Sequence, residues 1–85
     1  MAHVFEKIDA QLSVMDRRHV TPAGIYLNSK DLQELVEDLD AGLIQADPDG
    51  AYRSLPVHEV ADGKSYIATN QGGRVFVDMM VHWAT

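Results

Sequence analysis

The sequence contains no cysteine, and this absence excludes several kinds of chemistry. Disulfide bonds, zinc sites with thiolate ligands and thiol nucleophiles all require that residue. The absence also suits the reducing cytoplasm, where disulfides are rare. We therefore expect a cytoplasmic protein.

Long apolar runs are lacking as well. No run approaches the roughly 20 residues that span a bilayer. Near the N-terminus, Glu6, Lys7 and Asp9 interrupt the apolar residues, whereas a signal peptide has a continuous apolar segment. We expect no secretion signal and no membrane partner.

Basic residues are few, with 7 Lys and Arg against 13 Asp and Glu, for a formal net charge of −6. Non-specific nucleic-acid binding depends on clustered Lys and Arg, so we expect no direct nucleic-acid partner. Acidic residues gather between Lys30 and Arg53 with no basic residue among them. This stretch is either a solvated helix face or an acidic surface for a basic partner. Its members are Asp31, Glu34, Glu37, Asp38, Asp40, Asp47 and Asp49.

A chain of 85 residues with 46% hydrophobic residues is typical of one globular domain, which we place at residues 1–85. Two helices are predicted from apolar residues that recur every three or four positions. The first covers residues 2–18 and the second residues 29–41, where Asn28 is the N-cap and Gly42 follows the end. Their apolar stripes are Val4, Ile8, Leu12 and Met15, and Leu32, Leu35, Val36 and Leu39.

Four strands are predicted from short apolar runs between turn signals. The first surrounds Ile25–Leu27, and the second begins at or after Pro56, which favours a late start or an edge position. Turns at Asp62–Gly63 and Asn70–Gly73 then predict a three-stranded antiparallel meander, completed by strands 65–69 and 74–81. The expected fold is α+β, with two helices packed on a small, mostly antiparallel sheet in the order α-β-α-β-β-β.

No constellation in the sequence predicts catalysis, a metal site or a cofactor. A calcium-binding loop that started at Asp38 or Asp47 would lack its glycine at the sixth position. No histidine has a partner at metal-ligand spacing in the sequence. The four histidines are His3, His19, His58 and His82. We therefore expect a protein that is not an enzyme.

Large apolar side chains near the C-terminus are the expected contacts for a partner. Trp and Tyr dominate the energetics of many interfaces. Trp83 stands three residues from the end, where a large ring is hard to bury, and Met80 and Tyr66 accompany it. The other interpretation of these residues is ordinary packing in the core and at a sheet edge.

Two segments of the chain share a familiar order of features. Residues 21–32 join a proline, an apolar strand, a polar cap and a helix, and residues 52–57 end in Leu-Pro-Val before a hairpin signal. Over residues 21–77 this order resembles the C-terminal part of HK97-like major capsid proteins of tailed phages. Ser54 stands where that family has glycine, and the chain lacks the extended loop and long spine helix of a shell subunit. The resemblance implies a phage or prophage origin, and so the host cytoplasm, but not a shell subunit.

We predict a non-enzymatic interaction or assembly protein that acts through a protein–protein surface and forms a homo-oligomer. The alternative is a small acidic inhibitor that blocks a basic, nucleic-acid-binding surface of a host protein through Glu34, Glu37 and Asp38. A ligand- or metal-dependent enzyme is the least favoured hypothesis.

Overall fold

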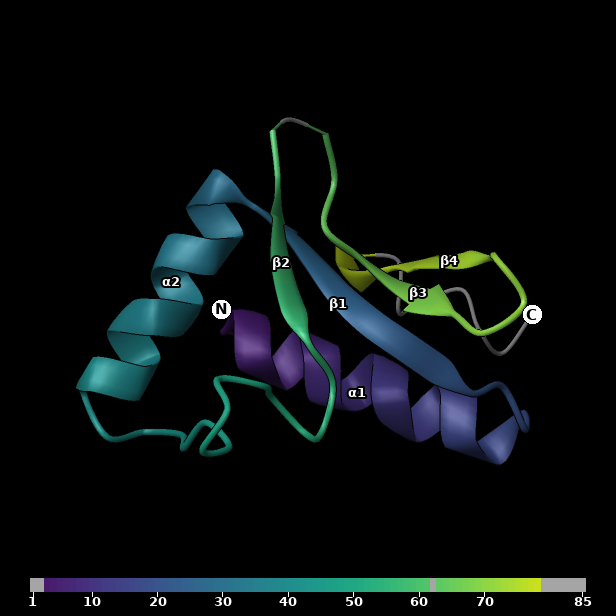
Figure 1. The fold of residues 1–85 in the computed structure, drawn as a ribbon, viewed down its shortest axis with the longest axis horizontal. Coiled ribbons are helices and arrows are strands. Elements are labelled where there is room, and N and C mark those ends of the chain that lie inside the picture. Colours follow the sequence, from purple (N-terminus) through teal and green to yellow (C-terminus); the bar gives the residue numbers. More distant parts are fainter. Residues whose placement is uncertain (1–2, 62, 79–85) are drawn as a thin grey trace.

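Two helices and a four-stranded mixed sheet make up the fold, in the predicted order α-β-α-β-β-β (Figure 1). The computed structural model describes residues 3–61 and 63–78. Within these residues, neither helix has the length and apolarity that a membrane-spanning helix requires. The elements are α1 (Val4–Arg17), β1 (Pro22–Asn28), α2 (Ser29–Asp40), β2 (Val57–Val60), β3 (Tyr66–Thr69) and β4 (Arg74–Phe76).

Both helices lie where their periodicity predicts them. At the start of α2, the Asn28 side chain accepts a hydrogen bond from Asp31 N at 2.8 Å, which confirms the predicted N-cap. At the start of α1, Glu6 Oε1 accepts from His3 N at 2.8 Å. Gly42 follows α2 with φ +80°, a backbone conformation that suits glycine.

The strand order is β2-β1-β3-β4, so the predicted meander is wrong. Strand β1 lies between β2 and β3, parallel to β2 and antiparallel to β3. The turn signal at residues 62–63 correctly indicated a reversal of direction, but it could not reveal a strand inserted between the two arms. Ile25 and Leu27 of β1 are fully buried, which suits a central position. The sheet is mostly antiparallel as predicted, since β3–β4 is also antiparallel.

The two edges of the sheet follow from local sequence. Strand β2 is an edge strand that begins just after Pro56, as the proline predicted, and Pro56 O accepts from Ile25 N at 2.8 Å. Strand β4 is shorter than the predicted 74–81, because Val77 and Asp78 form a 3₁₀ turn after Phe76. The rest of that predicted strand lies outside the described residues.

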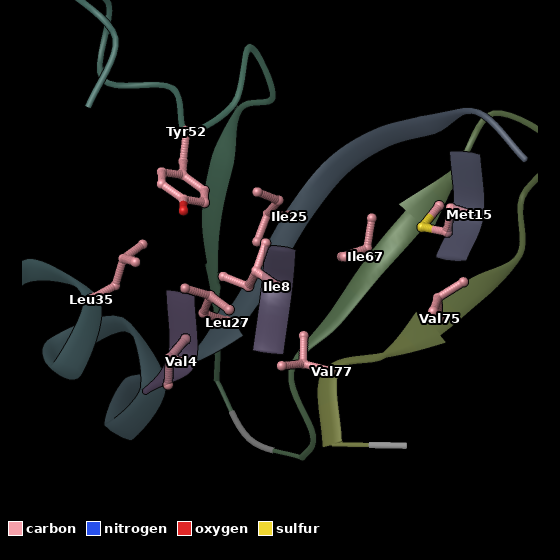
Figure 2. Packing of buried hydrophobic residues seen from close by; sticks show 10 residues of the cluster. All are labelled: Val4, Ile8, Met15, Ile25, Leu27, Leu35, Tyr52, Ile67, Val75 and Val77. Carbon is pink, nitrogen blue, oxygen red and sulfur yellow. The ribbon is translucent and has the colours of Figure 1, made fainter. Parts of the chain in front are cut away.

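The core lies on one face of the sheet and receives side chains from both helices. In Figure 1, α1 passes behind β1 and β2. Figure 2 shows the ten side chains of the cluster, most of them aliphatic. On the strands, alternate residues point into this cluster. The cluster consists of Val4, Ile8, Met15, Ile25, Leu27, Leu35, Tyr52, Ile67, Val75 and Val77.

Candidate functional site

The face of the sheet opposite the core carries a row of rings, one from each strand. We call His58, Tyr26, Tyr66 and Phe76 the aromatic row. Strand register places them side by side, because Tyr26 is opposite both His58 and Tyr66, and Tyr66 is opposite Phe76. Since successive residues of a strand face opposite sides, the row occupies the positions between the buried aliphatic residues.

The rings of the row contact one another in sequence across the sheet. Tyr26 stacks on His58, with ring centroids 4.8 Å apart, and on Tyr66, with centroids 5.1 Å apart. Phe76 meets Tyr66 edge to face at 6.1 Å. Aromatic pairs in such arrangements contribute about 0.5–1.5 kcal/mol each beyond area burial. The row therefore helps to hold the four strands in register.

The side chains of the row also stay accessible to solvent. Tyr26, Tyr66 and Phe76 are partly exposed and His58 is exposed. The exposed Arg74 places its guanidinium carbon 4.7 Å from the Tyr66 ring centroid. This is within cation–π range. The result is a ring surface with an arginine at its margin.

The charge of this surface differs from that of the whole chain. Alternation along the strands assigns to it the described residues Gly24, Tyr26, Asn28, Pro56, His58, Val60, Tyr66, Ala68, Arg74 and Phe76. None of these ten is acidic, although the net charge of the chain is −6. Glu59 belongs to the other side, since it is opposite Leu27, and its carboxylate accepts from Ser29 Oγ at 2.6 Å.

The predicted interface residues have different positions in the structure. Tyr66 lies in the aromatic row, flanked by Tyr26 and Phe76. Met80 and Trp83 lie outside the described residues. The sequence analysis did not single out the other three rings or Arg74 as candidates. Period-two alternation around Tyr26 and Phe76 was the available signal, but strand order was needed to bring them together.

The three predicted acidic contacts all lie on α2, but they differ in accessibility. Glu37 is exposed, whereas Asp38 is 7% exposed and accepts from His3 Nδ1 at 3.0 Å. Glu34 Oε2 accepts from Val4 N at 3.0 Å. Two of the three acids are therefore engaged with the start of α1 in the free protein, which leaves Glu37 as the most accessible of them.

The same contacts form a group of potential metal ligands that the sequence analysis did not anticipate. One ligand atom from each of His3, Glu34 and Asp38 lies within 4.8 Å of the other two. The four-residue spacing of Glu34 and Asp38 on a helix was a visible signal. The contribution of His3 depends on how α1 packs against α2.

A strained turn forms a second polar site next to the core. Arg53 and Ser54 both adopt the left-handed region, with φ of 54° and 66°. Asp9 accepts hydrogen bonds from Tyr52 Oη at 2.8 Å and from Arg53 Nη2 at 3.0 Å, and Asp47 Oδ2 accepts from Ser54 N at 2.8 Å. Burial, and then the hydrogen bond to Asp9, raise the pKa of Tyr52. The same carboxylate raises the pKa of Arg53. These bonds use the polar groups of the turn to hold its backbone, so the turn is structural.

Comparison with protein-family models, with curated proteins and with solved structures finds no match to this chain. The resemblance of residues 21–77 to HK97-like capsid proteins therefore stays a prediction.

Proposed function

We propose that this chain is a non-enzymatic interaction domain that binds protein through the aromatic row. The single observation that carries the proposal is the alignment of four partly or fully exposed rings across all four strands, with Arg74 beside them. Tyr and Arg are enriched among the residues that dominate binding energy at interfaces. Rings already ordered by one another lose little side-chain entropy when a partner covers them.

The first partner to test is a second copy of the chain. Purified protein is examined by light scattering after size exclusion over a wide range of concentrations. Self-association through the row predicts a mass above that of the 9.4 kDa monomer, and a return toward the monomer in Tyr66→Ala. Val36→Ala is the matched control, because Val36 is an exposed apolar residue on α2, away from the row.

A different protein partner is tested with the same two variants. The wild-type chain, Tyr66→Ala and Val36→Ala are used as baits in a host lysate. Proteins that bind the row are retained by the wild type and the Val36 variant but not by the Tyr66 variant. The proposal fails if the wild type is monomeric throughout and Tyr66→Ala retains the same proteins as the wild type.

The acidic-inhibitor alternative now depends mainly on Glu37. That residue is exposed on α2, and the neighbouring Val36 is 45% exposed, so together they offer charge and apolar area to a basic surface. Glu37→Lys should then weaken binding to the basic partner most strongly at low salt, where surface charges interact best. Binding that is unchanged at low salt would exclude this alternative.

We also propose a cytoplasmic location and a phage or prophage origin. The absence of cysteine supports the first, and the resemblance over residues 21–77 supports the second. Phage genes of related role cluster, so the neighbouring genes provide the test of origin. Neighbours without any phage character would argue against it.

A further inference from the structure

Three side chains that can ligate metal converge where the start of α1 meets α2. His3 Nδ1 lies 3.0 Å from Asp38 Oδ2 and 3.9 Å from Glu34 Oε2. Glu34 and Asp38 are one helical turn apart, so they project from the same side of α2. His3 directly precedes α1 and reaches them from the other helix.

We propose that His3, Glu34 and Asp38 bind one divalent first-row transition-metal ion, for which Zn²⁺ is the reference. Two carboxylates and a neutral imidazole carry two negative charges, which a divalent ion balances. An imidazole ligand favours zinc and other first-row transition metals, whereas calcium and magnesium prefer sites built entirely from oxygen ligands. Three protein ligands leave a fourth tetrahedral position for water.

The ligand spacing suits a tetrahedral ion. Bonds of about 2.0–2.1 Å to nitrogen and oxygen place the ligand atoms of a tetrahedron about 3.3–3.4 Å apart. The two distances from His3 Nδ1, 3.0 and 3.9 Å, lie on either side of this value. The ligand atoms of Glu34 and Asp38 also lie within 4.8 Å of each other, so all three separations are close to those of a bound ion.

The surroundings already orient the three ligands. Val4 N donates to Glu34 Oε2 at 3.0 Å, and this oxygen has a second lone pair for a metal. Glu6 Oε1 holds the backbone of His3, and the Asp38 side chain is only 9% exposed. A hydrogen bond to a ligating side chain, such as the one from Val4 N to Glu34, fixes ligand orientation in metal sites. Lys7, one turn further along α1, donates its ammonium to Asp78 Oδ1 at 2.9 Å, and the Glu34 carboxylate is close enough to contribute to the raised pKa of Lys7.

A bound ion would link two helices whose ligands lie 35 positions apart in the sequence. An ion that binds the native state and not the unfolded chain raises the apparent stability. The same three residues would act only as an ion-pair network if no metal binds. These two interpretations differ in their response to added zinc.

The test uses the untagged chain, freed of metal with a chelator and then dialysed. Thermal unfolding is recorded with ZnCl₂, with MgCl₂ or CaCl₂ at the same concentration, and without metal. We expect Zn²⁺ to raise the melting temperature, Mg²⁺ and Ca²⁺ to leave it near the metal-free value, and Co²⁺ to produce the visible absorption bands of a tetrahedral site. No shift with Zn²⁺, or an equal shift with Mg²⁺, would overturn the proposal.

Variants identify the ligands through zinc affinity, measured by titration calorimetry. His3→Ala and Asp38→Asn should each weaken zinc binding at least about tenfold. Removal of a residue that only hydrogen-bonds to a metal ligand costs about 10–100-fold in affinity, so removal of a ligand itself should cost no less. Glu34→Gln keeps an acceptor for Val4 N and so preserves the fold if the other two variants unfold. His19→Asn is the matched control, because it removes a distant histidine and tolerates the left-handed φ of 59° at that position. Variants that bind zinc as tightly as the wild type would refute the assignment.

Discussion

The two faces of the sheet are built from alternate residues of the same strands, yet they differ in chemistry and exposure. The inner face is aliphatic, and Ile25, Leu27 and Ile67 are fully buried there. The outer face is aromatic and partly exposed, and Tyr66 on that face is the direct neighbour of Ile67 in β3. One strand therefore buries one set of its side chains in the core and leaves the alternate set accessible to solvent.

Truncation of the inner face should have the largest effect. Ile67→Ala removes a fully buried side chain and leaves a cavity, so we expect a loss of about 2–5 kcal/mol in the free energy of unfolding. Equilibrium urea unfolding followed by circular dichroism provides the measurement. Val36→Ala, at an exposed position, should cost less than about 0.5 kcal/mol. If Ile67→Ala lowered the free energy of unfolding by less than Tyr66→Ala does, the proposed division between the two faces would be contradicted.

Truncation of a side chain on the outer face should lower the free energy of unfolding by less than Ile67→Ala does. Tyr66→Ala removes two ring contacts and the Arg74 contact, and aromatic pairs of this kind contribute about 0.5–1.5 kcal/mol each. Because the Tyr66 ring is partly hydrated in the folded protein, we expect the free energy of unfolding to fall by about 1–2 kcal/mol in total. A double-mutant cycle with Tyr26→Ala should show a coupling of about 0.5–1.5 kcal/mol. Additive losses would mean that the two rings do not support each other.

Tyr52 lies at the boundary between core and surface, because its ring packs in the core while its hydroxyl donates to Asp9. Tyr52→Phe should cost about 1 kcal/mol at neutral pH through the lost hydrogen bond. The folded state raises the pKa of Tyr52 above its ordinary value of 10.0, so the phenol holds its proton longer when folded. Its contribution is therefore complete below pH 10.0 and declines as the pH rises above that value. Stability measured against pH should fall less steeply there in the phenylalanine variant than in the wild type.

Ser54 offers the smallest effect and the only expected gain. Its φ of 66° strains an L residue, whereas glycine adopts this region freely but costs more entropy on folding. The balance predicts that Ser54→Gly raises the free energy of unfolding by about 0.5 kcal/mol. Ser13→Gly is the matched control, because in the middle of α1 the same substitution should destabilise by about 0.5 kcal/mol. A loss of stability in both variants would show that the turn is not strained.

Local patterns in the sequence predict most of the helices and strands of this protein. The apolar periods of three to four placed both helices, Asn28 marked the start of α2, and Pro56 marked an edge strand. Alternation in the last strand put Val75 and Val77 on the core face and Phe76 on the other. These features follow from interactions between residues close in sequence, which a local pattern records.

Which helices and strands lie next to one another depends on tertiary packing. The insertion of β1 between β2 and β3 aligned the aromatic row, and the packing of α1 on α2 brought His3 to Glu34 and Asp38. Both arrangements join residues about 30 to 40 positions apart, for which turn signals carry no information about register or strand order. The physical reason is that such contacts are decided by which packing of all the elements removes apolar surface from water, and in this fold Ile25 and Leu27 of the central strand β1 are fully buried.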